Sequence, residues 1–209
     1  MPEPLDDDPQ PMILDLTGTL LLSTPAIGDP RFARSVIFLC EHSEEGAFGL
    51  VINRPVPFLR LHAVLEQLGI ARGDALQDSP VMGGGPVETQ RGFVLLRDPS
   101  MLPGVEPDTG APDWGDCRLM ADGLALSAST EVLAAIARGE GPAQWLLALG
   151  YAGWGPGQLE AELAQNAWLT RPADPQLIFG AEHGEAQWLR ALRDMGIDPI
   201  GLSAQAGNA

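Results

Sequence analysis

The segment Gly150–Leu169 reads GYAGWGPGQLEAELAQNAWL and carries more structural information than any other part of the chain. The glycines in its first half let the backbone bend and approach neighbouring groups closely. Pro156 is typical of the first turn of a helix, and every fourth residue from Leu159 to Ala167 is apolar. The segment therefore predicts a glycine-rich turn followed by an amphipathic helix over residues 156–167.

The same segment contains little chemistry. It has no nucleophile, general base or set of metal ligands. Its carboxylates, Glu160 and Glu162, lie near the predicted N-terminal end of the helix, where negative charge is favoured. The segment is therefore informative about the fold and nearly silent about function.

The length of 209 residues fits one domain, and a hydrophobic content of 45% supports a buried core. No run of about 18 apolar residues occurs, so we expect no membrane span. We expect an acidic, disordered tail over residues 1–11, a single domain over 12–202 and a frayed tail over 203–209. The N-terminus lacks the basic and apolar regions of a secretory signal, which predicts a cytoplasmic protein.

The charge is strongly unbalanced. The chain has 28 acidic and 12 basic residues, all 12 of them arginine, and its formal net charge is −16. Because nucleic-acid binding relies on neutralising phosphates, this balance argues against a broad DNA or RNA interface. The absence of lysine excludes Schiff-base chemistry, a lysine general base and a P-loop lysine.

Short apolar runs bounded by turn signals predict strands. These runs span residues 19–23, 35–40, 48–53, 92–96, 145–150 and 176–180. The short link between the second and third runs predicts an antiparallel pair. Two further runs, 118–121 and 124–127, flank Asp122-Gly123, a dipeptide typical of a hairpin turn.

Apolar stripes predict three more helices. The first covers 61–68 and ends at Gly69, the second is capped by Ser129 and ends at Gly139, and the last covers 188–195 and ends at Gly196. Residues 98–116 are rich in proline and glycine and predict an irregular loop. Strands dominate the first part of the chain and helices interrupt later, which is typical of an α+β fold.

Four segments together resemble the AlgH/YqgE family of bacterial proteins. They occur in order across residues 14–202, and they are Asp29–His42, Gly49–Pro55, Gly83–Val87 with Arg91–Leu95, and Gly150–Trp154. The resemblance implies an α+β fold with a bifurcated mixed and antiparallel sheet, partly closed into a small barrel and surrounded by helices. It also carries the label of transcriptional regulator, but no established catalytic residues, substrate or cofactor.

The sequence offers little support for a catalytic or metal site. His42, His62 and His183 lie in distant segments, without a second ligand at metal-binding spacing, and read as turn-surface residues. No nucleophile elbow occurs. Cys40 lies among apolar residues and is expected to be buried, and nothing favours a disulfide between Cys40 and Cys117. We therefore predict no catalytic residues, no metal and no cofactor.

Anion binding is a weaker alternative to purely structural roles for two glycine-rich turns, Gly83–Gly85 and Gly153–Gly157, the second of which leads into a predicted helix N-terminus. Gly84 and Gly85 could present backbone N–H groups to an anion, and Arg54 at a strand end, beside Asn53, could clamp a carboxylate or phosphate. Trp145, Trp154 and Trp168 are expected in or near the core, and Trp154 is the one most suited to line a groove, because its flanking glycines leave it uncovered. Tight turns, close packing and internal salt bridges are the structural alternatives for Asn53, Arg54, Gly84, Gly85 and Trp154.

Three functions follow as hypotheses. The leading one is a non-catalytic regulatory domain that binds a small anionic ligand or a protein partner through Asn53, Arg54, Gly84, Gly85 and Trp154. The second is an enzyme acting on a small anionic metabolite, which would require His42, a carboxylate and an arginine in one cleft. The third is a transcriptional regulator, against which the net charge argues. The sequence does not give the oligomeric state and is compatible with a monomer.

Overall fold

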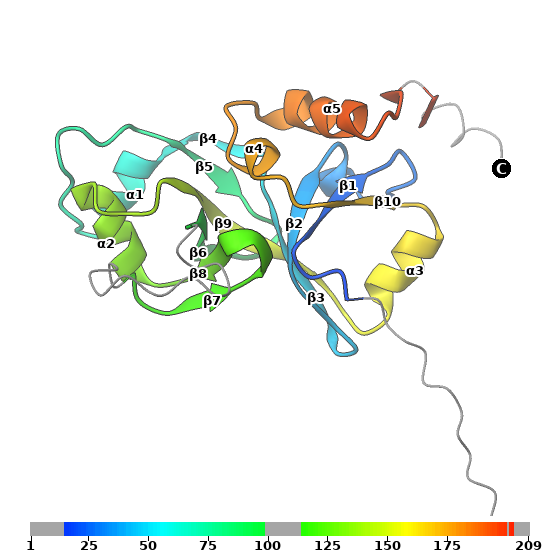
Figure 1. The fold of residues 1–209 in the computed structure, drawn as a ribbon, viewed down its shortest axis with the longest axis horizontal. Coiled ribbons are helices and arrows are strands. Elements are labelled where there is room, and N and C mark those ends of the chain that lie inside the picture. Colours follow the sequence, from blue (N-terminus) through cyan, green and yellow to red (C-terminus); the bar gives the residue numbers. More distant parts are fainter. Residues whose placement is uncertain (1–14, 99–113, 200, 203–209) are drawn as a thin grey trace, which may run out of the picture.

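The protein is described by a computed structural model over residues 15–98, 114–199 and 201–202. In these residues ten strands form one branched sheet (Figure 1). Its main path follows the order β10-β1-β2-β3-β9-β6-β8-β7, and β4 and β5 form a branch beside β9. The strands are β1 (Thr19–Ser23), β2 (Val36–Ser43), β3 (Gly46–Val51), β4 (Pro55–Arg60), β5 (Pro80–Gly83), β6 (Val87–Arg97), β7 (Cys117–Leu119), β8 (Leu124–Ser127), β9 (Gln144–Trp154) and β10 (Trp168–Pro172).

The sheet forks at β9. Residues 147–149 of β9 pair with β5 in parallel and with β6 in antiparallel orientation, whereas residues 152–154 pair with β3. Gly150 lies between the two regions at φ +72°. A Cβ atom on Gly84 would lie 2.2 Å from the Gly150 carbonyl oxygen, and one on Gly85 would lie 2.0 Å from the Tyr151 carbonyl carbon. Glycine is required here because the crossing backbones leave no room for side chains.

Helices pack on both ends and one edge of this sheet (Figure 1). They are α1 (Leu61–Gln67), α2 (Thr130–Arg138), α3 (Gln158–Ala164), α4 (Pro175–Ile178) and α5 (Gly184–Asp194), with short 3-10 turns at η1 (Pro30–Phe32) and η3 (Ala121–Gly123). The sheet curls into a half-barrel, so the α+β class and the bifurcated, partly closed sheet are confirmed.

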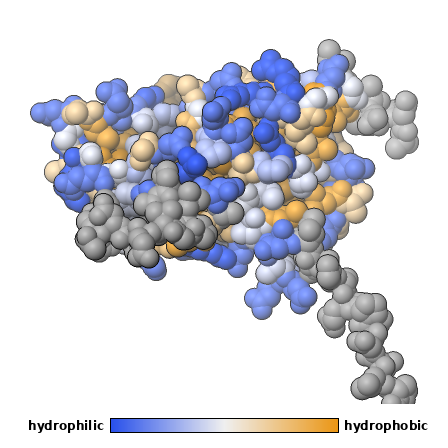
Figure 2. All heavy atoms as spheres, in the orientation of Figure 1, coloured by the Kyte–Doolittle hydropathy of each residue, from blue (hydrophilic) through white to orange (hydrophobic). Residues whose placement is uncertain are grey.

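The sheet divides the buried apolar residues into three clusters. The largest lies between the inner face of the half-barrel and helices α4 and α5, and it includes Phe38, Leu95 and Trp188. A second lies against α1 and α2, and a third lies against α3. Burial of these surfaces is the main favourable term in folding. Polar side chains cover most of the face shown in Figure 2.

Most predicted strands and helices are confirmed, with shifted ends. The 35–40 and 48–53 runs form the antiparallel pair β2 and β3. The hairpin of β7 and β8 turns at Asp122 and Gly123, whose φ angles of +59° and +70° suit the tight turn that their sequence predicts. Helix α2 ends at Gly139, which adopts φ +79°.

The prediction of a strand over 176–180 is wrong. Pro175–Ile178 forms helix α4. The Asp174 carboxylate accepts a hydrogen bond from the Gln176 N–H at 2.9 Å, and Pro175 occupies the first helical position. These N-terminal signals outweigh the short apolar run that suggested a strand.

Helix α3 begins later than predicted, and helix α2 begins at the predicted N-cap residue without the capping hydrogen bond. Helix α3 begins at Gln158, because Gly157 adopts φ +71° and Pro156 lies outside the helix. Ser129 occupies the N-cap position of α2, but its hydroxyl donates to the Trp114 carbonyl at 3.1 Å and makes no capping bond.

Strands β4 and β10 were not predicted from the sequence. Each contains proline, and each pairs with only one other strand, so each is an edge where proline is tolerated. The predicted tails, 1–11 and 203–209, and most of the predicted 98–116 loop lie outside the described residues. None of the helices in the described part of the chain has the length and apolar character that crossing a membrane requires.

Candidate functional site

Three aromatic rings meet where the neighbouring strands β3, β9 and β6 cross. Phe48 of β3 lies 5.0 Å from Tyr151 of β9 and 5.5 Å from Phe93 of β6, measured between ring centroids. Phe93 and Tyr151 lie 6.1 Å apart, nearly perpendicular to each other. These separations are typical of favourable aromatic contacts. Phe93 is buried, whereas Phe48 and Tyr151 are partly exposed, so the rings form a surface that extends from the core to solvent.

Two guanidinium groups flank the rings. Arg91 lies over Phe93, with 5.0 Å between its Cζ atom and the ring centroid, which is the geometry of a cation–π contact. Its Nη1 atom lies 3.1 Å from Oε2 of Glu88. Arg118 of β7 pairs with Glu41 of β2 at 2.5 Å. All four of these charged side chains are about half exposed, so each ion pair contributes about 0–1 kcal/mol and exchanges readily with a competing anion.

Together these side chains line a cavity of about 460 Å³, which we call the aromatic–arginine pocket. Its lining is Phe48, Arg91, Phe93, Asp116, Cys117, Arg118, Leu126, Ala128 and Tyr151. The volume is in the range of small-molecule sites. The lining combines apolar rings with two guanidinium groups and one carboxylate, that of Asp116.

The five predicted ligand-binding residues do not line one site. Asn53 is fully buried, and its amide nitrogen donates to the carbonyls of Arg34 and Gly184, each at 2.9 Å. Its amide oxygen accepts a hydrogen bond from the Val36 N–H at 2.9 Å. Both amide N–H groups are therefore used inside the protein, and Asn53 ties β2 to the start of α5.

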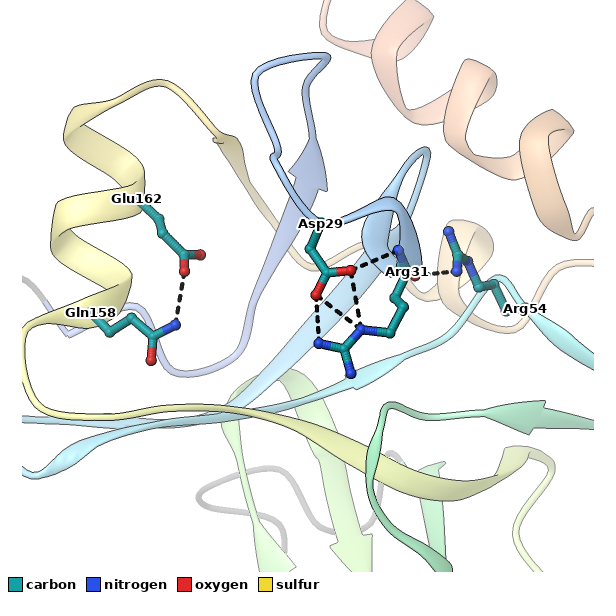
Figure 3. A network of polar contacts seen from close by, with 5 residues as sticks. All are labelled: Asp29, Arg31, Arg54, Gln158 and Glu162. Atoms are coloured by element: carbon teal, nitrogen blue, oxygen red, sulfur yellow. Dashed lines mark hydrogen bonds and ion pairs between the residues drawn. The ribbon is translucent and has the colours of Figure 1, made fainter.

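Arg54 binds backbone carbonyls in place of a carboxylate. Its terminal nitrogens donate to the carbonyls of Arg31 and Ala33 in the loop between β1 and β2 (Figure 3). In the same loop Asp29 forms an ion pair with Arg31 at 2.6 Å. Desolvation by partial burial lowers the pKa of Arg54 from its ordinary value, while nearby Asp29 opposes this shift. The structural alternative for Arg54 was an internal salt bridge. In the structure Arg54 instead donates to two backbone carbonyls and so holds the loop in place.

Gly84 and Gly85 have the structural role that was the alternative to anion binding. The Gly84 N–H donates to the Leu149 carbonyl, and its own carbonyl accepts from Val51, both at 2.8 Å. Gly85 lines a second cavity, described below.

Trp154 lies close to the core, since its exposed fraction is 7%. The neighbouring ring of Trp168 packs against it, with 5.9 Å between the ring centroids. Trp154 also lines a cavity of about 500 Å³ together with Phe48, Tyr151 and Gly153.

His42 is not the turn-surface residue that the sequence suggested, whereas His183 lies in the loop before α5 and is partly exposed. His42 is buried, its Nδ1 accepts the Leu16 N–H at 3.2 Å, and its Nε2 lies 2.9 Å from Glu160. Because Nδ1 accepts, Nε2 carries the proton and donates to Glu160. His62 bonds the Leu76 carbonyl at 3.1 Å in another part of the molecule. Both ring nitrogens of His42 are therefore engaged in hydrogen bonds within the protein. Among the described residues no cluster of three or more metal-ligating side chains occurs.

Neither Cys40 nor Cys117 forms a disulfide. Cys40 is fully buried, and desolvation raises its pKa well above the ordinary value, so it is a poor nucleophile. Cys117 is partly buried in the lining of the aromatic–arginine pocket.

Comparison with known proteins identifies the family. Residues 20–200 match the AlgH-like family. The chain belongs to this family. It is 48% identical to a UPF0301 protein of Paracoccus denitrificans, covering 93% of this chain and 97% of that protein. It is 46% identical to a UPF0301 protein of Ruegeria pomeroyi, covering 94% and 100%.

Solved structures of similar proteins support the AlgH-like assignment. The solution structure of the AlgH protein from Pseudomonas aeruginosa matches with a TM-score of 0.70 and 44% identity, covering 96% of this chain and 98% of that one. Protein DIP2367 from Corynebacterium diphtheriae matches with a TM-score of 0.63 and 23% identity over 90% of this chain and 89% of that one, which shows the shared fold alone.

Sequence reasoning missed the aromatic–arginine pocket, although several of its residues lie in the segments that resemble the AlgH-like family. Arg91 and Phe93 belong to one of them, and Tyr151 belongs to another. These segments were interpreted as strands and turns. The sequence signal that could have found the pocket is the alternation of side chains along a strand, because residues two apart lie on the same face. That rule places Arg91 and Phe93 together, but it does not say that Tyr151 and Phe48 join them.

Proposed function

We propose that this AlgH-like protein is a non-catalytic, cytoplasmic binding domain whose aromatic–arginine pocket takes a small molecule combining a planar ring with a carboxylate or phosphate. The observation that supports it best is the placement of two half-exposed guanidinium groups beside three mutually contacting rings. A planar ring can stack on Tyr151 or Phe48, and arginine binds a carboxylate or phosphate with two parallel hydrogen bonds.

Local charge does not prevent anion binding. The carboxylates of Glu88 and Glu41 already occupy the arginines, so a ligand must displace them. Because those ion pairs are exposed, the displacement costs little. A ligand anion that replaces them forms ion pairs of the same exposed kind, and the Asp116 carboxylate in the lining opposes it. The additional affinity therefore comes from stacking of the ligand ring on Tyr151 or Phe48, which contributes about 0.5–1.5 kcal/mol.

Thermal shift followed by calorimetric titration tests this function. The panel contains nucleoside monophosphates, aromatic carboxylates such as salicylate, and their uncharged amides or nucleosides as controls. We expect the charged members to raise the melting temperature and the uncharged analogues to have little effect, because a ligand that binds only the folded state stabilises it.

Matched variants locate the site. Arg91→Gln and Arg118→Gln should each weaken binding about tenfold or more, since each removes a charged hydrogen-bond donor. Arg138→Gln is the control, because Arg138 has the same 55% side-chain exposure as Arg91 and also forms an ion pair, with Glu140. A flat response across the panel at millimolar concentration, or equal losses for Arg138→Gln and Arg91→Gln, would contradict the proposal.

A further inference from the structure

A second cavity lies on the opposite face of the strands that form the aromatic–arginine pocket. It has a volume of about 470 Å³ and lies between helices α1 and α2 and strands β5, β6 and β9. We call it the apolar pocket. Its buried part consists of Val94, Leu133 and Leu147 with Ser127, whose hydroxyl donates to the Asp116 carbonyl. Figure 2 shows apolar residues reaching the surface at the end of the molecule that holds α1 and α2.

The lining of the apolar pocket carries no charge. Among the described residues that line it there is no Asp, Glu, Arg or His, in a chain where 28 residues are acidic. Its polar side chains are amides and hydroxyls, and Gln67, Thr89, Gln90 and Thr130 are exposed. The cavity therefore has an apolar interior and an uncharged polar entrance. A charged ligand would lose its hydration there without gaining a counter-ion.

Two glycines of the wall have room for a side chain. A Cβ atom on Gly92 would lie 3.8 Å from the Leu147 and Leu149 side chains, and one on Gly83 would lie 3.6 Å from Val56. These are ordinary van der Waals distances, and neither residue has a positive φ. At Gly84 and Gly85, by contrast, the crossing backbones leave no room for a Cβ atom. Glycine inside a strand weakens it and marks either a bulge or the close approach of another group. The pairing of β6 with β9 shifts register between Val87 and Gly92, whereas Gly83 has no such shift in its pairing with β9.

We propose that the apolar pocket binds an uncharged small molecule with an apolar body, whose hydrogen-bonding end faces the amides and hydroxyls of the entrance. Gly92 and Gly83 keep the space for that body open. The inference rests on the second cavity alone and does not depend on the proposed function of the aromatic–arginine pocket.

Two fluorescent probes test this inference. N-phenyl-1-naphthylamine is uncharged, and its 8-sulfonate has the same rings with one negative charge. Both are titrated into full-length protein carrying Arg91→Gln and Arg118→Gln, so that sulfonate binding at the aromatic–arginine pocket does not contribute. We expect saturable 1:1 binding of the uncharged probe and binding of the sulfonate at least about tenfold weaker.

Blocking the cavity gives the second test. Gly92→Val fills space in the apolar pocket and should lower the affinity for the uncharged probe about tenfold or more. The variant should fold, because valine suits a strand better than glycine does. Gly28→Val is the control, since a Cβ there meets nothing within 4 Å and φ is not positive. Equal affinity of Gly92→Val and Gly28→Val for the uncharged probe, or equal binding of both probes, would overturn the inference.

Discussion

Glu162 holds two buried tryptophans, and its removal should destabilise the protein strongly. Its Oε2 atom accepts the indole N–H of Trp154 at 2.9 Å and that of Trp168 at 2.7 Å. Its Oε1 atom accepts the amide of Gln158 at 2.9 Å (Figure 3). The indoles are only 7% and 3% exposed, so Glu162→Ala leaves two N–H groups without their acceptor.

The size of the effect follows from these contacts. An orphaned buried donor costs about 1–3 kcal/mol, so two cost about 2–6 kcal/mol. Glu162 is partly exposed, and water entering the vacated space satisfies part of this demand, which brings the expected loss to about 2–4 kcal/mol. With a urea m value of about 2 kcal/mol/M, a loss of 3 kcal/mol lowers the midpoint by about 1.5 M.

Urea unfolding followed by tryptophan fluorescence measures this loss, with Glu140→Ala as the exposed control. The triple variant Glu162→Ala, Trp154→Phe, Trp168→Phe removes the acceptor and both donors. The urea midpoint of the triple variant should be higher than the midpoint calculated by adding the stability losses of the three single variants, because no indole N–H is left unpaired. Strict additivity, or a loss for Glu162→Ala below about 0.5 kcal/mol, would refute the reasoning.

Three further outcomes are expected. Gly85→Ala should lower the free energy of unfolding, measured in urea, by about 2–4 kcal/mol, because its Cβ would lie 2.0 Å from the Tyr151 backbone. Gly92→Ala should leave the free energy of unfolding unchanged or raise it. Equal stabilities of the two variants would contradict the close crossing at β9. Hydrogen bonds from the Arg31 side chain and backbone lower the pKa of Asp29 in the folded protein. The ionised carboxylate therefore stabilises the folded state above about pH 4, and this contribution is lost as the pH falls through the pKa that Asp29 has in the folded protein. The melting-temperature difference between the protein and Asp29→Asn should therefore shrink from pH 6 to about pH 3, and a constant difference would exclude the carboxylate as its source. Titration with labelled duplex DNA should show no binding even at low salt, and a salt-dependent affinity would favour the transcriptional-regulator hypothesis instead.

The sequence predicted most elements whose signals are local. The turn at Asp122-Gly123 and the end of α2 at Gly139 follow from backbone conformations that few residues adopt. Helix α4 was misread because a three-residue apolar run was weighed above the Asp-Pro start signal before it. Edge strands β4 and β10 contain prolines, and their formation depends on which strand passes beside them. Local sequence does not contain that information.

The roles of Glu160 and Glu162 show why sites are harder to predict than elements. Both were interpreted by their position near a helix start, where acidic residues are favoured. In the structure Glu160 pairs with His42, 118 residues away in sequence, and Glu162 binds the two tryptophans. Their position near a helix start explains why acidic residues are favoured there, but it does not reveal their tertiary partners. Those partners come close only when α3 packs on the sheet.

Strand β6 shows the same limit for the two cavities. Arg91 and Phe93 line the aromatic–arginine pocket, whereas the intervening Gly92 and the following Val94 line the apolar pocket. One short run thus serves two cavities of different chemistry, because successive residues of a strand point to opposite faces. A register shift of one residue would exchange the faces and place a guanidinium in the uncharged cavity. The burial of a charge makes that alternative costly, so the same residues that line the two cavities also fix the register of β6.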